Sequence, residues 1–315
     1  TFIPIVLQKA ENGSSRLKRV ILIGDHHQLP PVVKNPAFQK YCKMDQSMFG
    51  RLIRLGVPSI QLNAQGRARP EIAKLFSWKY RDLDNLPCTA NGMYELANPG
   101  FAHEMQFINV DNFCGSGETE PTPHFYQNIG EAEYIVNVYQ YMRLLGYPAS
   151  KISIITTYRG QKHLIRDIVT RRCTRHPLFG VPSRITTVDK FQGQQNDYVL
   201  LSLVRTRHIG HMRDIRRLIV ALSRARLGLY IFGRETLFKD SIDLSPSFQH
   251  LFKFPTKLGL VPTEAFPGSR RKGENRIPYL VEDPVAMGCV VNQLVAKYEA
   301  DDKVEQQYYS KVVAI

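Results

Sequence analysis

Four short polar segments hold the side chains of this sequence that could do chemistry on phosphate groups. GDHHQLPP, at residues 24–31, contains Asp25 and Gln28. The others are AQGRARPEI at 64–72, VDKFQGQQNDY at 188–198 and ALSRAR at 221–226. Arginine and glutamine recur in these segments, and guanidinium and amide N–H groups are suitable donors to phosphate oxygens.

The GDHHQLPP segment follows an apolar run and has two interpretations. A turn at the end of a buried strand would place Asp25 and Gln28 at the rim of a crevice, where α/β proteins bind phosphates. The alternative is a surface turn whose two histidines are simply solvated. A metal site at His26 and His27 is disfavoured, because adjacent side chains diverge and no further ligand lies near them in the sequence. We therefore predict no metal ligand in this chain.

The overall composition indicates a globular, basic protein. Lys and Arg number 42 against 28 Asp and Glu, a net charge of +14 that suits a polyanion such as nucleic acid. The alternative is an unspecific excess of surface charge. The five cysteines are scattered without a CxxC pair, so we expect neither a zinc site nor a disulfide framework. No apolar run approaches the ~20 residues of a membrane span, so we expect no membrane partner.

The hydrophobic pattern predicts alternating strands and helices. Continuous apolar runs such as ISIIT and YVLLSLV are typical of parallel strands covered on both faces, with functional loops at their carboxyl ends. The predicted strands are 19–24, 59–62, 105–110, 151–156, 184–188, 197–204 and 228–233, and the predicted helices are 46–56, 70–80, 131–146, 160–172 and 214–226. Beyond residue 254 we expect an irregular, partly disordered tail with one possible helix at 284–299.

Taken in order, the polar segments resemble the motifs of superfamily 1 helicases. GDHHQLPP resembles the third motif, and with TTYRGQ at 156–161 the resemblance extends over residues 19–235. The subgroup is that of RNA helicases related to the nonsense-mediated-decay helicase. Within this subgroup, the motifs AQGRAR, FQGQQNDY and SRARLGLYIF most resemble those of the intron-binding, helicase-like proteins of the spliceosome. The resemblance implies an α/β fold of the RecA-like, P-loop NTPase type, in which helices flank a parallel sheet.

The resemblance also implies roles for individual residues. ATP would lie between two RecA-like domains, and the 188–195 segment would link nucleotide and nucleic acid. The implied catalytic residues, which sense the γ-phosphate, are Gln28, Arg67 and Arg224; the nucleotide-binding residues are Asp25, Gln65, Gly193 and Gln195; the RNA-binding residues are Tyr158, Arg159, Gln161, Asp189, Gln192 and Arg205. Taken singly, each has an ordinary interpretation, such as a solvated helix face for Arg224 or a core ring for Tyr158.

The chain departs from the helicase pattern in three places. Gly66 stands where the subgroup has an aromatic residue that would border the base. Gln195 stands where it has an acid, so an amide replaces a carboxylate that would accept from ribose hydroxyls. No G-x-x-x-x-G-K-[ST] segment and no Asp-Glu pair after an apolar strand occur in the sequence. We therefore expect the Mg²⁺ ligands to lie upstream of this chain, and the chain alone to be inactive.

These observations predict a domain organisation and a function. Residues 1–60 would end the first RecA-like domain, 61–254 would form the second, and 255–315 would be an extension. The whole protein would be a nuclear ATP-dependent RNA helicase of pre-mRNA splicing. Its partners would be single-stranded intron RNA and the spliceosomal proteins of the intron-binding complex. Two alternatives stay open: a catalytically weak scaffold that clamps RNA in the spliceosome, favoured by Gly66 and Gln195, and a DNA helicase.

Overall fold

The computed structural model describes residues 7–8, 13–31, 33, 35–267 and 277–313 of the chain. Its contacts divide the chain into two compact units, residues 1–62 and residues 63–315. Each unit has its own helices, and the strands β1 to β11 of the described residues all belong to the second.

The first unit contains two short helices. These are α2 (Pro36–Lys40), with Asn35 as its N-cap, and α3 (Met48–Arg54), with Ser47 as its N-cap. Both N-cap side chains accept a backbone N–H. The predicted helix at 46–56 is thus confirmed in a shorter form. The predicted strands at 19–24 and 59–62 are absent, and both segments are exposed: Ile23 is 95% and Ile60 96% accessible. Strands of this apolar kind require neighbours on both faces, and the described residues supply none.

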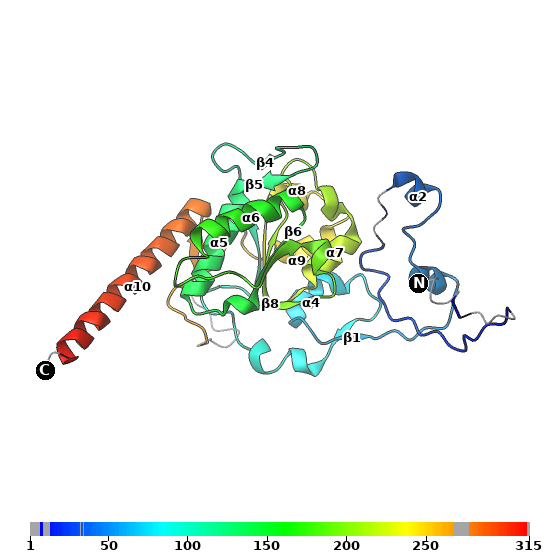
Figure 1. Ribbon diagram of the computed structural model, residues 1–315, viewed down its shortest axis with the longest axis horizontal. Coiled ribbons are helices and arrows are strands. Elements are labelled where there is room, and N and C mark those ends of the chain that lie inside the picture. Colours follow the sequence, from blue (N-terminus) through cyan, green and yellow to red (C-terminus); the bar gives the residue numbers. More distant parts are fainter. Residues whose placement is uncertain (1–6, 9–12, 32, 34, 268–276, 314–315) are drawn as a thin grey trace. The chain divides into compact units, whose positions relative to one another are not determined.

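The second unit is built on a five-stranded parallel sheet (Figure 1). Its spatial order is β3-β9-β8-β6-β7, and every neighbouring pair is parallel. The strands are β3 (Met105–Asn109), β6 (Ile152–Thr156), β7 (Arg184–Thr187), β8 (Asn196–Ser202) and β9 (Ala225–Gly233). The predicted α/β, RecA-like fold class is confirmed.

Helices cover both faces of this sheet, as the alternation of side chains along its strands requires. In β3, Phe107 packs against Phe248 on one face, whereas Ile108 belongs to the core on the other. The helices on the Ile108 side are α5 (Ile129–Leu144) and α6 (Arg159–Arg172); the other helices of the domain are α4 (Pro70–Ser77), α7 (Ile215–Leu222), α8 (Glu235–Lys239) and α9 (Ser245–Leu251).

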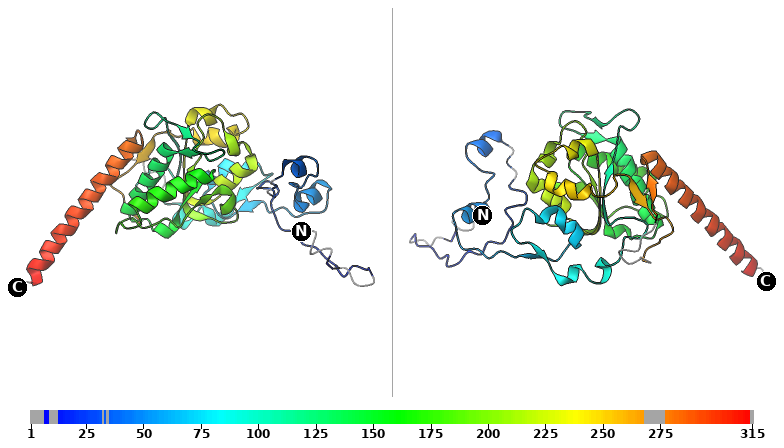
Figure 2. Two further views of the ribbon diagram at one scale, coloured as in Figure 1. Left: turned by 45° about the horizontal axis from the view of Figure 1, so that its top comes forward. Right: turned by 180° about the vertical axis from the view of Figure 1, so that it is seen from behind.

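The C-terminal region is more ordered than its sequence predicts. Strands β10 (Leu258–Leu260) and β11 (Tyr279–Val281) form an antiparallel pair, and helix α10 (Pro284–Val313) follows them. Helix α10 packs on α5 through buried Met287, Val290 and Val291, and then continues beyond the domain (Figure 2). The irregular tail expected beyond residue 254 is thus wrong where β10 and β11 form, and the predicted helix is confirmed in a longer form. The expected partial disorder stays a prediction. Residues 268–276 lie outside the described residues.

Helix α7 is shorter than predicted, and this changes the setting of two arginines. The helix ends at Leu222, and β9 starts at Ala225, where it pairs with Asn196 of β8. Arg224 therefore lies in the link between helix and strand, and Arg226 lies in the strand. The predicted helix over 214–226 is wrong at its C-terminal end because pairing with β8 overrides the helical pattern.

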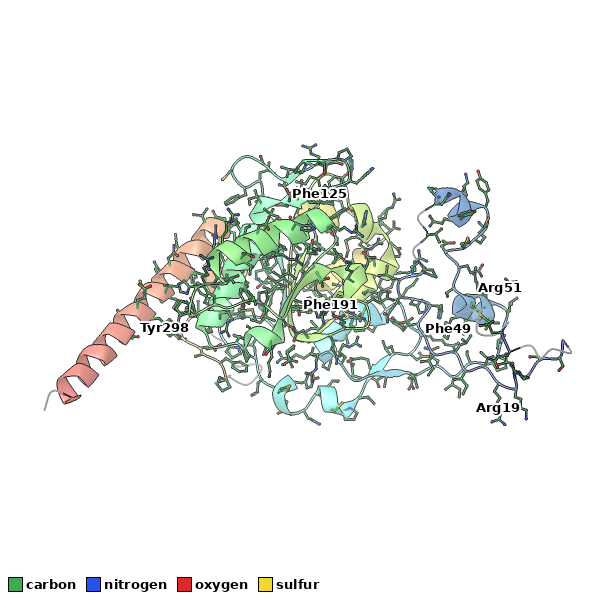
Figure 3. The ribbon with its side chains drawn as sticks, in the orientation of Figure 1. Arg19, Phe49, Arg51, Phe125, Phe191 and Tyr298 are labelled. Carbon is green, nitrogen blue, oxygen red and sulfur yellow. The ribbon has the colours of Figure 1, made fainter. Side chains whose placement is uncertain are left out.

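Short elements complete the second unit. A 3₁₀ helix, η4 (Val188–Phe191), follows β7 and is anchored by the buried ring of Phe191 (Figure 3). Two-residue strands form the pairs β1 (Ala64–Gln65) with β2 (Asp84–Asn85) and β4 (Glu118–Thr119) with β5 (Gln127–Asn128).

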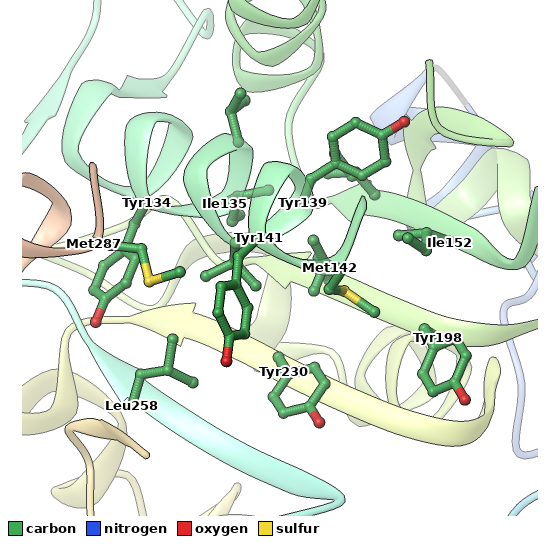
Figure 4. Close-up of a cluster of buried hydrophobic side chains, with 14 of the residues drawn as sticks. Tyr134, Ile135, Tyr139, Tyr141, Met142, Ile152, Tyr198, Tyr230, Leu258 and Met287 are labelled. Carbon is green, nitrogen blue, oxygen red and sulfur yellow. The ribbon is translucent and has the colours of Figure 1, made fainter. Parts of the chain in front are cut away.

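The core on the α5 side is rich in tyrosine (Figure 4). Tyr134, Tyr139 and Tyr141 all belong to α5, and each is fully buried. Their hydroxyls donate to the carbonyl oxygens of Val281, Phe179 and Gly100, respectively. A buried tyrosine combines a large apolar ring with one polar atom that must find a partner. These three residues therefore connect α5 to strand β11 and to two separate loops.

Candidate functional site

The predicted site residues of the second unit gather at the two opposite edges of its sheet. The amino-edge cluster (Gln65, Arg67, Gln195, Ser223 and Arg224) lies where β8 and β9 begin. The carboxyl-edge cluster (Glu118, Tyr126, Tyr158, Arg205 and His211) lies beyond the ends of β6 and β8. The arginines of the amino-edge cluster thus lie at the amino ends of the strands, whereas the sequence predicted functional loops at the carboxyl ends.

Arg67 projects from the loop before α4 and is half-buried. Its Nε donates to Gln195 Oε1 at 2.6 Å, and its Nη1 donates to the carbonyl oxygen of Ser223 at 3.0 Å. Gln65 shapes the loop: its Oε1 accepts the backbone N–H groups of Arg67 and Ala68, and its Nε2 donates to Ala68 O. Gln65 and Gln195, which were predicted to bind nucleotide, thus form hydrogen bonds with Arg67 and its loop.

Arg224 is 1% exposed, and its guanidinium is held by oxygens of the domain. Nε donates to Val220 O at 2.8 Å, Nη1 to Gln194 O at 3.2 Å and Nη2 to Ser223 Oγ at 2.6 Å. A buried charge is tolerated only with such partners. Through Ser223 and Gln194, Arg224 therefore joins Arg67 to the 192–195 turn.

Arg226 has different partners and is more accessible than Arg224. Its Nη1 donates to Asp197 at 2.6 Å and its Nη2 to the hydroxyl of Tyr94 at 3.2 Å. The same hydroxyl donates to the carbonyl oxygen of Arg67 at 3.0 Å. Arg226 therefore supports the backbone of the Arg67 loop from the side.

The 188–195 segment connects the two edges of the sheet. At the carboxyl edge, Asp189 pairs with Arg217 in the first turn of α7, with 3.1 Å between oxygen and nitrogen. At the amino edge, the carbonyl oxygen of Gln194 accepts from Arg224. Gly193, between them, has φ of +78°, a conformation that favours glycine. Gln192 is exposed beside it.

In the carboxyl-edge cluster, Arg205 is buried rather than open to solvent. Its guanidinium lies 4.0 Å from the ring centre of Tyr126, and its Nε donates to Glu118 at 2.9 Å. Its Nη1 approaches the hydroxyl of Tyr158, which also accepts the backbone N–H of His211. Burial favours a higher pKa for Glu118, but the bonds from Arg205 and two backbone N–H groups outweigh it and lower that pKa.

Three residues predicted to contact RNA therefore have internal roles. Gln161 is fully buried; its amide bonds to both backbone groups of Asn128 and to Ser202 Oγ. Tyr158 and Arg205 are buried against one another. The polar groups of Tyr158, Gln161 and Arg205 thus bond inside the domain, and their direct contacts with RNA stay a prediction.

A cationic surface lies next to this cluster, made of Arg159, Lys162 and Arg166 on α6 and Lys190 on η4. Burial lowers the pKa of Lys162, and the charges of the other three residues lower it further. Within the described part of the chain, none of the four forms an ion pair. Phe125, labelled in Figure 3, lies beside them. Its ring stacks with that of His163, with ring centres 6.1 Å apart. The sequence prediction named only Arg159 here, although the i, i+3, i+7 spacing of the α6 cations was readable.

The predicted residues of the first unit meet in one turn. Asp25 Oδ1 accepts the backbone N–H of His27 at 2.8 Å, and Asp25 Oδ2 accepts from Gln28 Nε2 at 2.9 Å. This is the local side-chain turn that Asp commonly forms. In the residues that the structure describes, no three His, Cys, Asp or Glu side chains converge to hold a metal ion. We therefore assign no step of a reaction to Mg²⁺ on these residues.

A fully buried carboxyl group, that of Glu131, lies beneath the carboxyl edge. Ser202 Oγ donates to its Oε2 at 2.6 Å, and the N–H of Val204 donates to both of its oxygens. Burial raises the pKa of Glu131 to about 8, despite these donors. The folded domain therefore retains a proton that the unfolded chain releases.

This retained proton predicts how stability depends on pH. Its stabilisation is complete below pH 4.5 and is lost as pH rises through about 8. At about 1.4 kcal/mol per pKa unit, the unfolding free energy should fall by up to roughly 5 kcal/mol over this whole range. Glu131→Gln, which carries no proton to release, should not show this fall. Urea unfolding at about pH 5.5 and about pH 8.5, followed by fluorescence of the single tryptophan, Trp78, measures it. The same fall in both proteins would contradict the assignment.

Comparison with known proteins identifies the class. The family described as AAA domain matches residues 44–236, more than half of the chain. The chain therefore belongs to the AAA-domain family, and its relatives confirm the resemblance to superfamily 1 helicases.

Three individual relatives are named as an RNA helicase, a splicing factor and a regulator of nonsense transcripts. RNA helicase aquarius of Mus musculus is 59% identical over 283 residues, which cover 90% of this chain and 19% of that protein. Pre-mRNA-splicing factor cwf11 of Schizosaccharomyces pombe is 34% identical over 253 residues, 80% of this chain and 20% of that protein. Regulator of nonsense transcripts 1 homolog of Arabidopsis thaliana is 31% identical over 226 residues, 69% of this chain and 18% of that protein. The chain thus spans about a fifth of these curated relatives. No described helix is long and apolar enough to cross a lipid bilayer.

Proposed function

We propose that this chain is the C-terminal helicase segment of an ATP-dependent RNA helicase that binds intron RNA during splicing. One observation carries the proposal: the 188–195 segment touches an arginine cluster at one edge of the sheet and borders a cationic surface at the other. A helicase requires such a link, because ATP hydrolysis at one site must change how tightly the protein binds nucleic acid at another.

On the ATP side, we assign Arg67 and Arg224 to the γ-phosphate; Arg224, whose nitrogens bond inside the domain, must exchange one of these bonds for a phosphate oxygen. A guanidinium keeps its charge at every physiological pH and offers several N–H donors in a fixed plane. Such groups stabilise the charge on a phosphoryl group in transfer. We also assign Gln28, held by Asp25, to sensing of the γ-phosphate and Gly193 to nucleotide binding.

On the RNA side, we assign the cationic surface to the phosphate backbone of single-stranded RNA. Lys and Arg groups without acidic partners attract a polyanion and release its counterions. The ring of Phe125 beside them suits a stacked base. Arg159, Asp189 and Gln192 keep their proposed RNA contacts, since each reaches solvent at or next to this surface.

The biological setting follows from the relatives, and so it is part of the proposal. One relative is named an RNA helicase and another a pre-mRNA-splicing factor. We therefore propose intron RNA and proteins of the spliceosomal intron-binding complex as partners, and the nucleus as the location.

A scaffold that clamps RNA without much hydrolysis is the second candidate, and one observation favours it. A Cβ added at Gly66 would lie 2.9 Å from Leu86 Cδ1, so Leu86 occupies the space of the absent aromatic side chain. The nucleotide would then meet an aliphatic contact in place of a ring.

ATP turnover separates these candidates. Full-length protein should hydrolyse ATP when RNA is added, whereas this 315-residue chain alone should show no turnover, because it lacks a phosphate loop. The chain alone should still bind single-stranded RNA weakly, with affinity that falls steeply as salt rises. If the full-length protein bound RNA but did not hydrolyse ATP, the scaffold function would be supported and the ATP-dependent helicase contradicted. Turnover by the chain alone would contradict the assignment of the missing groups.

A further inference from the structure

The chain leaves β8 through a strained three-residue turn. The N–H of Arg205 donates to the carbonyl oxygen of Leu203 at 2.9 Å, and Val204 between them has φ of +74°. Together these features define a γ-turn of the rare kind with positive φ. A β-branched residue is unfavourable in this region, where glycine is the ordinary choice. Strain of this kind persists only where the surroundings enforce it, and it concentrates at functional sites.

Buried side chains hold three polar groups of this turn. Both oxygens of Glu131 accept the N–H of Val204, at 3.0 and 2.9 Å. Asn128 Nδ2 donates to Val204 O at 3.2 Å, and Thr157 Oγ1 donates to Leu203 O at 3.1 Å. Asn128 and Glu131 lie at the start of α5, Thr157 follows β6, and all three are buried. The turn is therefore fixed from several directions at once.

The turn decides where the following residues lie. Directly after it, the side chain of Arg205 reaches Glu118 and the ring of Tyr126. The N–H groups of Thr206 and Arg207 also donate to Glu118. The 205–213 segment then passes Tyr158, at the N-cap of α6, and presents exposed Arg207 and Arg213. It thus runs beside the helix that carries most of the cationic surface.

We propose that Glu131 and Asn128 are positioning residues, which hold the γ-turn at Val204 and so present the 205–213 segment to the phosphate backbone of single-stranded RNA. The inference rests on the proposed RNA binding at the carboxyl edge. Neither residue touches the strand itself. Their contribution is to hold the cations of the 205–213 segment beside those of α6, so that both can contact the same RNA backbone.

The first test measures RNA affinity of the full-length protein without nucleotide. Glu131→Leu removes both acceptors of the Val204 N–H, whereas Glu131→Gln retains one. We expect a dissociation constant for labelled oligouridine about tenfold weaker with leucine, and within about twofold of wild type with glutamine. Glu133→Gln, two residues along α5 and paired with Arg172, is the matched control and should bind like wild type. A titration at high RNA gives the active fraction, so misfolded protein is not mistaken for weak binding.

A second test distinguishes positioning from general support of the fold. Glycine adopts positive φ without strain, so Val204→Gly removes the need for the clamp. In that background, Glu131→Leu should weaken RNA binding by less than about threefold, since a double-mutant cycle subtracts the loss of the valine side chain. An equal loss in both backgrounds, or an active Glu131→Leu protein that binds like wild type, would overturn the inference. If Lys162→Glu with Lys190→Glu also left affinity unchanged, the proposed RNA site itself would fail.

Discussion

Replacing Arg224 by alanine in the full-length protein should lower RNA-stimulated ATP hydrolysis by roughly 10³-fold or more. RNA affinity without nucleotide should stay near that of wild type, because Arg224 is buried at the amino edge, away from the cationic surface. An arginine that faces a phosphoryl group in transfer stabilises charge that exists only in the transition state. Parallel measurements of turnover and of RNA affinity check this pair of outcomes.

The buried setting of Arg224 sharpens the choice of variants. Its three nitrogens donate in three directions, to Val220, Ser223 and Gln194. Arg224→Lys should rescue poorly, since an ammonium group retains the charge but cannot span these acceptors. Arg226→Ala is the matched control: its guanidinium pairs with Asp197, and its loss should reduce turnover far less. If Arg224→Ala hydrolysed ATP like wild type, the assignment to the phosphate would be wrong.

Reversing two charges of the cationic surface should produce the second large effect, this time on RNA. Lys162→Glu with Lys190→Glu should weaken RNA binding on the order of 10- to 100-fold at moderate salt. The dependence of log affinity on log salt should also become shallower, by about 0.7 for each phosphate that the protein no longer neutralises. Turnover at saturating RNA should be largely retained, because the amino-edge cluster is untouched.

A charge-matched control is available on the same helix and in the loop after it. Arg171 lies in the last turn of α6 and Arg175 follows it, both exposed at the far end from Lys162. Arg171→Glu with Arg175→Glu changes the net charge equally but should alter RNA affinity by less than about threefold. Equal losses in the two double variants would mean that total charge, rather than this surface, binds the RNA.

Much of the sheet could be predicted from the sequence, for a definite reason. Continuous apolar runs such as ISIIT and YVLLSLV require cover on both faces, and they form the parallel strands β6 and β8. The same reasoning was wrong for residues 19–24, because pattern shows what a strand requires but not whether its neighbours are present. The end of α7 was also wrong, because the pairing of Ala225 with Asn196 is a long-range contact.

The sequence predicted which residues of the amino-edge cluster lie together better than it predicted where they lie in the fold. Arg67, Gln195 and Arg224 meet as expected for one site, but at the amino ends of the strands. No local sequence pattern shows at which end of the sheet a helix such as α7 ends. Gln161 and Arg205 have the polarity of surface residues, and only the tertiary structure shows that their partners are internal.

The γ-turn at Val204 had no signal in the sequence. Positive φ is predicted from glycine or asparagine, and valine predicts the opposite. The acceptor that holds the turn, Glu131, lies 73 residues earlier in the chain. Strain of this kind becomes visible only in a structure, where the backbone angle and its buried partners are seen together.

Gly193→Ala tests most directly whether the 188–195 segment couples ATP chemistry to RNA. Gly193 has φ of +78° and no atom within 4 Å of an added Cβ, so alanine disturbs the backbone alone. Gly180, with φ of +64° and equal space, is the matched control. The measurement is the ratio of ATP turnover with saturating RNA to turnover without RNA. We predict that this ratio falls several-fold in Gly193→Ala but not in Gly180→Ala, while RNA affinity stays within about twofold. A wild-type ratio in Gly193→Ala would contradict the proposed coupling.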